Sequence, residues 1–196
     1  TAQGPGGGGA RGTARGVSIL IAQGAAPAYA QALPRRLQGT PAMRPGFIFM
    51  LTRNDLTVPD APAHLETALA AGVRQIGFKD VGLPVEALRA IAARIRAAGG
   101  TCWLEVVSLD ADREAASVRA GIEIGVDRLL GGCRADVAAQ LLAGTGIGYY
   151  PFAGRISGHP SVLEGDAAEI AASARALAAR PEVAGLDLLA YRGRVP

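Results

Sequence analysis

The sequence contains few lysine, cysteine, histidine or aromatic residues. Of its 20 basic residues only Lys79 is a lysine, and all the others are arginine. Its two cysteines, Cys102 and Cys133, lack metal-ligand spacing, which argues against a disulfide framework and a cysteine-based zinc site. Its two distant histidines provide no metal triad. No apolar run approaches the about 18 residues that a membrane-spanning helix needs.

The composition indicates one globular domain without a polyanionic partner. With 196 residues, 49% of them hydrophobic, the chain is long enough to bury a core. Its formal net charge of +3 is small and evenly spread. We therefore expect neither a nucleic-acid nor a membrane-surface partner, and we expect a cytoplasmic protein that acts on a small molecule.

The chain divides into three segments by composition. Residues 1–16 are rich in glycine and are interpreted as a tail or linker. Residues 17–44 form either an extra βα unit or an irregular segment. A second interpretation of this segment is a degraded secretory signal, because Arg11 and Arg15 precede an apolar run that Pro27 interrupts. Residues 45–196 are the main domain.

In the main domain, short apolar runs alternate with helical periodicity. The expected strands are residues 47–52, 73–78, 101–109, 126–130, 147–152 and 185–191. The expected helices are residues 61–71, 85–98, 110–124, 135–143 and 167–179, with a long glycine-rich loop before the last one. Alternation at intervals of about 25 residues is typical of parallel βα units with right-handed crossovers.

This pattern predicts an α/β fold, a parallel (β/α) barrel of the TIM-barrel type. An eight-stranded barrel usually takes about 250 residues, so the chain is one or two βα units short. The alternative is an open, doubly wound sheet, which fits the length. Against that alternative, no expected strand is followed directly by G-x-G-x-x-G or a Walker loop.

Lys79 is the most informative residue for function. Alternation along its strand places Gly77 and Lys79 on one face, toward a barrel interior, and Ile76 and Phe78 on the other. A lysine in this position can form a Schiff base or transfer a proton, which an arginine cannot do. The alternative is a lysine without a catalytic role, either partly exposed at the strand end or in a structural ion pair.

Glu105 is the second catalytic candidate. It is a lone carboxylate in an otherwise apolar strand, and a buried carboxylate is costly unless it is paired. If its strand adjoins that of Lys79, the two side chains face each other. They would then form a proton-transfer pair, a Schiff-base lysine with its acid, or a structural salt bridge. Asp187 is interpreted as a structural, inward-facing carboxylate.

Further polar residues follow the strands, where active sites of parallel α/β proteins form. Asp80 is the third catalytic candidate. The candidate substrate-binding residues are Arg53, Asn54, Arg155, His159 and Tyr191. Asp55, Asp80 and Glu105 are a weak candidate set for magnesium. No metal or cofactor is otherwise expected.

Two segments carry a resemblance to a known family. They are AGVRQIGFKD at residues 71–80 and IGVDRLLGG at residues 124–132. With its compact repeats, the chain resembles the ribulose-phosphate-binding (β/α)₈ barrels. The resemblance implies an isomerase, epimerase or lyase that acts by proton transfer at carbon on a small, phosphorylated sugar or carbonyl substrate. The glycine-rich phosphate turns of these barrels follow the last two strands, which this chain lacks.

Two other function classes remain open. One is a catalytically inert barrel that binds a metabolite or serves as an assembly subunit. The other is a metal-assisted aldolase. An incomplete barrel would also expose strand edges, so a homo-oligomer is expected.

Overall fold

The computed structural model describes residues 46–193 and confirms the expected α/β class. The tail at residues 1–16 and the segment at residues 17–44 lie outside the described residues. The main sheet has five parallel strands in the order β1-β4-β5-β6-β7. Its strands are β1 (Phe49–Met50), β4 (Gln75–Lys79), β5 (Thr101–Val106), β6 (Arg128–Gly131) and β7 (Gly148–Tyr150).

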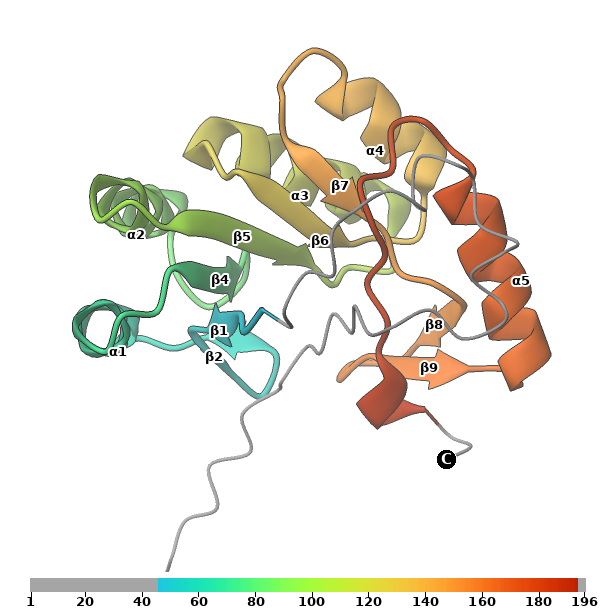
Figure 1. The fold of residues 1–196 in the computed structure, drawn as a ribbon, viewed down its shortest axis with the longest axis horizontal. Helices are drawn as coiled ribbons and strands as arrows, with labels where there is room; N and C mark the ends of the chain where they lie inside the picture. Colours follow the sequence, from blue (N-terminus) through green and yellow to red (C-terminus); the bar gives the residue numbers. More distant parts are fainter. Residues whose placement is uncertain (1–45, 194–196) are drawn as a thin grey trace, which may run out of the picture.

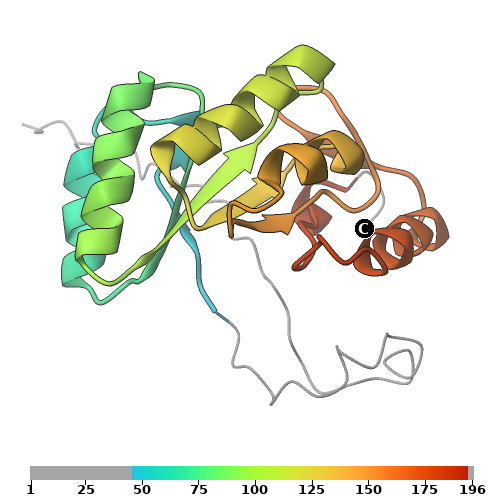
Figure 2. The same ribbon diagram turned by 90° about the horizontal axis from the view of Figure 1, so that it is seen from above.

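Each strand of this sheet is added beside the previous one. The connecting helices are α1 (Ala61–Ala70), α2 (Val85–Ala97), α3 (Ala111–Ile124) and α4 (Ala135–Leu142), and α5 (Ala167–Ala178) follows β7. Figures 1 and 2 show α1 to α4 arranged along the same side of the sheet. A doubly wound sheet reverses its strand order at a switch point, and the five strands described here do not.

The far edge of the sheet is extended by an irregular segment. Two parallel bridges, Tyr149 with Val183 and Phe152 with Asp187, place this segment beside β7. The expected strand at residues 185–191 is therefore only partly formed, and it ends in the short 3₁₀ helix η3 (Ala190–Arg192). Among residues 46–193 no sheet closes on itself.

Two small hairpins interrupt the alternation of strands and helices. The expected strand at residues 47–52 breaks after β1, and the chain then forms a hairpin of β2 (Thr52–Arg53) and β3 (Leu56–Thr57). The expected glycine-rich loop contains a second hairpin, β8 (Arg155–Ser157) with β9 (Val162–Glu164). This hairpin forms because Ile156 and Leu163 pack with Phe152 and Leu189, a tertiary contact that no local pattern predicts.

The five helices begin and end within about one residue of their expected bounds. The Asp110 side chain accepts a hydrogen bond from the Arg113 N–H and caps α3 as expected. Asp166 and Glu169 form a capping box at the start of α5. None of the helices within residues 46–193 has the length and apolar character that crossing a bilayer requires.

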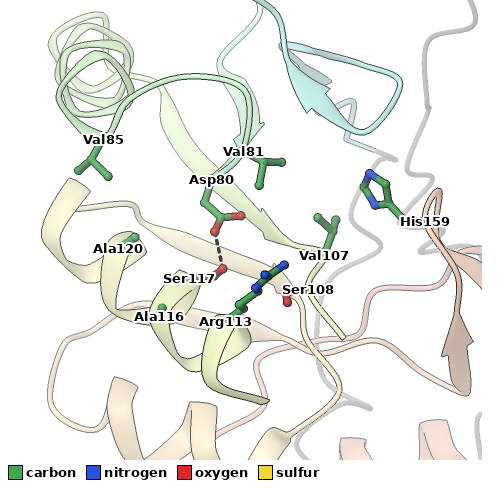
Figure 3. A pocket seen from close by; sticks show the side chains of 10 residues that line it. All are labelled: Asp80, Val81, Val85, Val107, Ser108, Arg113, Ala116, Ser117, Ala120 and His159. Atoms are coloured by element: carbon green, nitrogen blue, oxygen red, sulfur yellow. Dashed lines mark hydrogen bonds between the residues drawn. The ribbon is translucent and has the colours of Figure 1, made fainter. Parts of the chain in front are cut away.

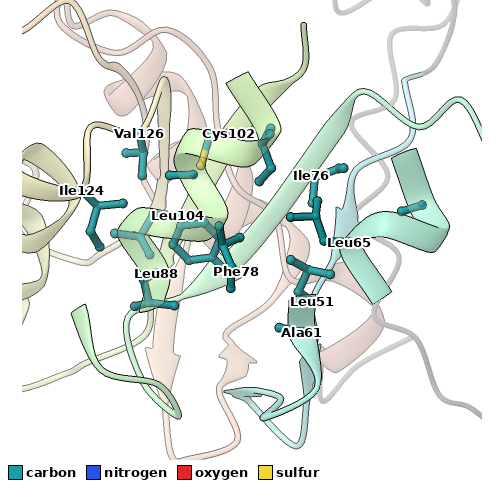
Figure 4. Close-up of a cluster of buried hydrophobic side chains, with 14 of the residues drawn as sticks. Leu51, Ala61, Leu65, Ile76, Phe78, Leu88, Cys102, Leu104, Ile124 and Val126 are labelled. Atoms are coloured by element: carbon teal, nitrogen blue, oxygen red, sulfur yellow. The ribbon is translucent and has the colours of Figure 1, made fainter. Parts of the chain in front are cut away.

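Alternation along the strands builds two different faces. Ile76, Phe78, Cys102 and Leu104 point toward the helices and pack in the main core, which Figure 4 shows. The opposite face carries Trp103 and Leu130, and it also carries the two side chains Lys79 and Glu105. The expected orientation of Lys79 away from the helices is therefore confirmed.

Candidate functional site

Lys79 and Glu105 meet at the ends of two neighbouring strands. They are direct register partners on β4 and β5, and the Lys79 Nζ lies 3.3 Å from the Glu105 Oε2. Both residues are buried, each with 4% of its surface exposed. The expected pair is therefore formed, at the carboxyl end of the parallel sheet, where α/β proteins place their sites.

A second carboxylate reaches Lys79 from the first hairpin. Asn54 and Asp55 form its two-residue turn, and both have positive φ, 52° and 61°, as a type I′ turn requires. The Thr57 hydroxyl donates to the Lys79 carbonyl at 2.7 Å and accepts from the Lys79 N–H at 2.9 Å. This clamp holds the hairpin against β4, and the Asp55 Oδ1 lies 2.8 Å from the Lys79 Nζ.

Arg192 completes the ion pairs around Asp55. Its two guanidinium nitrogens donate to the two Asp55 carboxylate oxygens at 2.7 and 3.0 Å, a bidentate arrangement. The Ser161 N–H also donates to Asp55, at 3.3 Å. The Arg192 side chain is 22% exposed, whereas that of Asp55 is 1% exposed. Arg192 is therefore the member of this cluster that solvent reaches most easily.

Asp187 interacts electrostatically with this cluster, but its carboxylate has no hydrogen-bond partner among the described residues. It is fully buried, and neither of its carboxylate oxygens has a partner among the described residues. Its backbone is fixed beside β7, where its N–H donates to the Pro151 carbonyl and its own carbonyl accepts from the Ala153 N–H. A buried carboxylate without a hydrogen bond among the described residues is unusual in a folded protein.

The environment separates the acids of the cluster by their pKa. Burial raises the pKa of Asp55, but hydrogen bonds from Arg192 and Lys79 and their positive charges outweigh it and hold the pKa well below its usual range. Burial raises the pKa of Glu105, although Lys79 opposes this shift. Burial and the nearby Glu105 charge raise the pKa of Asp187 well above its usual range. The cluster thus contains one carboxyl with a lowered pKa and two with raised pKa values.

Asp80 and His159 lie elsewhere, in a pocket of about 520 Å³. Asp80 follows Lys79 along the chain, but its side chain points toward α3, where it accepts a hydrogen bond from the Ser117 hydroxyl (Figure 3). Burial raises the pKa of Asp80, while the hydrogen bond from Ser117 partly opposes the shift. The structure does not bring this catalytic candidate together with Glu105.

The remaining candidates are spread over the surface. Arg53 and Asn54 are exposed at the first hairpin, and Tyr191 is 90% exposed beside Arg192. Arg155 lies on β8 and lines a separate cavity of about 300 Å³ with Glu164 and other polar residues. These four residues do not gather around Lys79.

Asp55, Arg192 and Asp187 also belong to the cluster, although none of them is predicted from the sequence as a catalytic or substrate-binding residue. The sequence predicts Asp55 only as one ligand of a weak magnesium site with Asp80 and Glu105. Among residues 46–193 no group of three side chains is arranged to hold a metal ion, and the Asp80 carboxyl points away from Asp55 and Glu105. The sequence signal for Asp55 was the Asn-Asp pair between two short β-prone stretches, which is typical of a tight turn.

No family model, curated protein or solved structure matches the chain.

Proposed function

We propose that the chain is an isomerase or lyase that moves a proton at a carbon atom of a small, anionic substrate. A phosphorylated sugar or carbonyl compound is the substrate class, as the resemblance implies. The strands belong to a (β/α) barrel-like fold in this proposal, and its support is the consecutive order of parallel strands with helices along one side.

One observation carries the proposal. The fully buried Asp187 carboxylate has no hydrogen bond among the described residues, its charge interacts with that of Glu105, and both acids have raised pKa values. Burying an unsatisfied carboxylate destabilises a fold, so an arrangement of this kind is typical of acid–base sites. Two buried carboxyls whose charges interact disfavour the doubly ionised state, so one is ionised while the other stays neutral.

Such a pair can carry both halves of a proton transfer. The ionised carboxylate removes a proton from the carbon next to a carbonyl, and the C–H electron pair forms an enolate. The neutral carboxyl then donates its proton to the neighbouring carbon while the proton of the adjacent hydroxyl passes to the former carbonyl oxygen, which completes an isomerisation. In a lyase of the aldolase type the ionised carboxylate instead takes the proton of the β-hydroxyl, the C–C bond breaks to leave an enolate, and the neutral carboxyl protonates the carbon of that enolate. Lys79, whose Nζ lies between the carboxyl groups of Asp55 and Glu105, would stabilise the enolate oxygen electrostatically.

Arg192 provides the contact with the anionic end of the substrate. It is the most exposed charged member of the cluster, and its guanidinium presents two parallel donors, which fit a carboxylate or a phosphate. An incoming anion competes with Asp55 for these donors.

The test is hydrogen exchange at carbon. Small phosphorylated aldoses and ketoses are incubated with the chain in D₂O, and loss of C–H signals is followed by proton NMR. We expect exchange in the wild type and a loss of about 10²-fold to 10⁴-fold in Glu105→Gln and in Asp187→Asn. Asp112→Asn, at an exposed acid on α3, is the matched control.

Two results would contradict the proposal. One is the absence of exchange with every substrate of this class. The other is exchange that persists in folded Glu105→Gln and Asp187→Asn variants. A borohydride-trapped adduct on Lys79 would instead assign the lysine the role of nucleophile, which the sequence left open.

A second candidate function, a catalytically inert barrel, has one observation in its favour. The Asp55–Arg192 ion pair joins residues 137 positions apart and connects the first hairpin to η3. A contact of this kind stabilises the fold. In that case Asp55→Asn and Glu105→Gln would both lower stability, while neither would change the binding of any ligand.

A further inference from the structure

The pocket that contains Asp80 is separate from the ion-pair cluster around Lys79. It lies at the carboxyl ends of β4 and β5, between the start of α2 and α3 (Figure 3). The side chain of Asp80 enters it from the helix side of the sheet, whereas Lys79 occupies the other face. Neither Lys79 nor Glu105 lines this pocket. A ligand bound here would not touch the acid–base pair.

One end of the pocket carries donors that have no partner among the described residues. Arg113 and His159 line it, and within residues 46–193 the guanidinium and the imidazole form no hydrogen bond or ion pair. Ser108 lines it as well, with a hydroxyl that is likewise without a hydrogen bond among the described residues. A free guanidinium beside an imidazole and a hydroxyl is a suitable set of donors for an anion.

The Asp80 carboxyl supplies a polar group deeper in the same pocket. Its Oδ2 accepts from Ser117, but its Oδ1 is buried without a partner. A buried polar atom without a hydrogen bond is unusual in a native protein, and a bound ligand is one of the ordinary reasons for it. The raised pKa of Asp80 agrees with this, because a neutral carboxyl can donate to a ligand oxygen.

The remaining wall is apolar. Val81, Val85 and Val107 come from the sheet side and the start of α2, and Ala116 and Ala120 come from α3. These small side chains leave room for an aliphatic chain of a few carbon atoms. The volume of about 520 Å³ is that of an ordinary small-molecule site.

We propose that this pocket binds a small organic anion, a phosphate monoester or carboxylate with an aliphatic body, at Arg113, His159 and Ser108. The Asp80 carboxyl makes a hydrogen bond to a hydroxyl or carbonyl oxygen of the ligand, and the valine and alanine wall packs on its carbon chain. This binding does not depend on the function proposed for Lys79 and Glu105.

The test is calorimetric titration of the 196-residue chain with butyl phosphate, pentanoate, inorganic phosphate and butanol. We expect saturable binding of butyl phosphate or pentanoate, and the stronger of the two identifies the anionic group. Inorganic phosphate and butanol, which each lack one half of the ligand, are expected to bind at least about tenfold more weakly.

Two variants locate the binding in this pocket. Arg113→Gln removes the guanidinium, and Ala116→Leu fills the apolar wall at an exposed helical position where leucine is tolerated. Each is expected to weaken binding about tenfold or more. The matched controls are Arg119→Gln, an exposed arginine on α3 outside the pocket, and Ala176→Leu, an exposed alanine on α5.

Three results would overturn the proposal. The first is no saturable binding of either organic anion. The second is binding that both Arg113→Gln and Ala116→Leu leave unchanged. The third is inorganic phosphate binding as tightly as butyl phosphate, which would mean that the apolar wall contributes nothing.

Discussion

The Lys79 Nζ lies 3.3 Å from the Glu105 Oε2, on the strand next to its own. The same nitrogen lies 2.8 Å from the Asp55 Oδ1, and Asp55 differs from Glu105 in the direction of its pKa shift. Asp55 is held ionised by two cations, whereas burial favours the neutral form of Glu105. The lysine therefore stands between a permanent counter-ion and an acid that can exchange its proton.

Asp187→Asn should stabilise the fold while it removes activity. Above its usual pKa of 3.8 the unfolded chain releases the proton of Asp187, whereas the folded protein retains it to a higher pH. The folded state is therefore progressively destabilised as the pH rises from 3.8 toward the folded-state pKa. We expect the free energy of unfolding of Asp187→Asn at pH 7 to exceed that of the wild type by on the order of 1 kcal/mol or more, because the variant lacks this ionisable group.

Urea denaturation between pH 4 and pH 8 measures this effect. The wild type should lose more stability over this range than Asp187→Asn. Equal slopes of stability against pH would show that Asp187 does not retain its proton on folding. A gain in stability together with loss of activity is typical of a residue kept for function.

Asp55→Asn should destabilise the protein by about 3 kcal/mol, because it leaves Arg192 unpaired and Lys79 with Glu105 alone. Asparagine tolerates the positive φ of this turn position, so the substitution tests charge and not backbone geometry. The folded-state pKa of Asp55 lies below 3.8, so its stabilisation is present above that pH and is lost as the pH falls.

Thermal unfolding at pH 7 and at pH 3 checks this prediction. The difference between wild type and Asp55→Asn should shrink at the lower pH. Asp60→Asn is the control, since the exposed Asp60 carboxylate does not cap α1. An unchanged melting temperature for Asp55→Asn would contradict the assignment of a buried ion pair.

Gly77→Ala should cost about 1–3 kcal/mol because of overpacking. A Cβ at Gly77 would collide with the Met50 sulfur and come within 3.2 Å of the Trp103 Cβ. Gly77 lies two residues before Lys79 on β4, on the same face of the sheet. Gly46→Ala is the matched control, because nothing lies within 4 Å of a Cβ at that position. Chemical denaturation measures the free energy of unfolding of the two variants. Equal values would mean that the surroundings of Gly77 are loosely packed.

Cys133 should react slowly with iodoacetamide, although it is exposed. Partial burial and the Glu114 carboxylate raise the pKa of its thiol, and only the thiolate is a nucleophile. Glu114 is itself held by N–H groups of Cys133 and Arg134 at 2.9 and 2.7 Å. Glu114→Gln removes the negative charge, so it should lower this pKa and speed alkylation at pH 8.

Mass spectrometry of the labelled protein measures the rate at each cysteine. Buried Cys102, with its thiol pKa raised to about 12, should stay unlabelled in the folded state. Glu123→Gln, on the exposed side of α3, is the control and should leave the Cys133 rate unchanged. Equal rates in wild type and Glu114→Gln would contradict the proposed influence of the carboxylate.

The amino-acid sequence by itself determined the helices, the parallel strands and one pair of the site. Helical periodicity and capping residues such as Asp110 are local, so they could be recognised without the fold. Strict alternation along β4 and β5 was enough to place Lys79 and Glu105 face to face, because strand order followed chain order.

Only the tertiary structure decided which other residues join that pair. Asp55 lies in the tight turn of a hairpin that the hydrogen bonds of Thr57 hold against β4. Arg192, which pairs with Asp55, is 137 positions away from it in the chain. Asp80 follows Lys79 in the chain yet points to the other side of the sheet, because successive residues of a strand alternate between its faces. Contacts between segments so far apart in the chain leave no local pattern. Composition and spacing therefore could not predict that the Asp187 charge interacts with Glu105, or that its carboxylate has no hydrogen bond among the described residues.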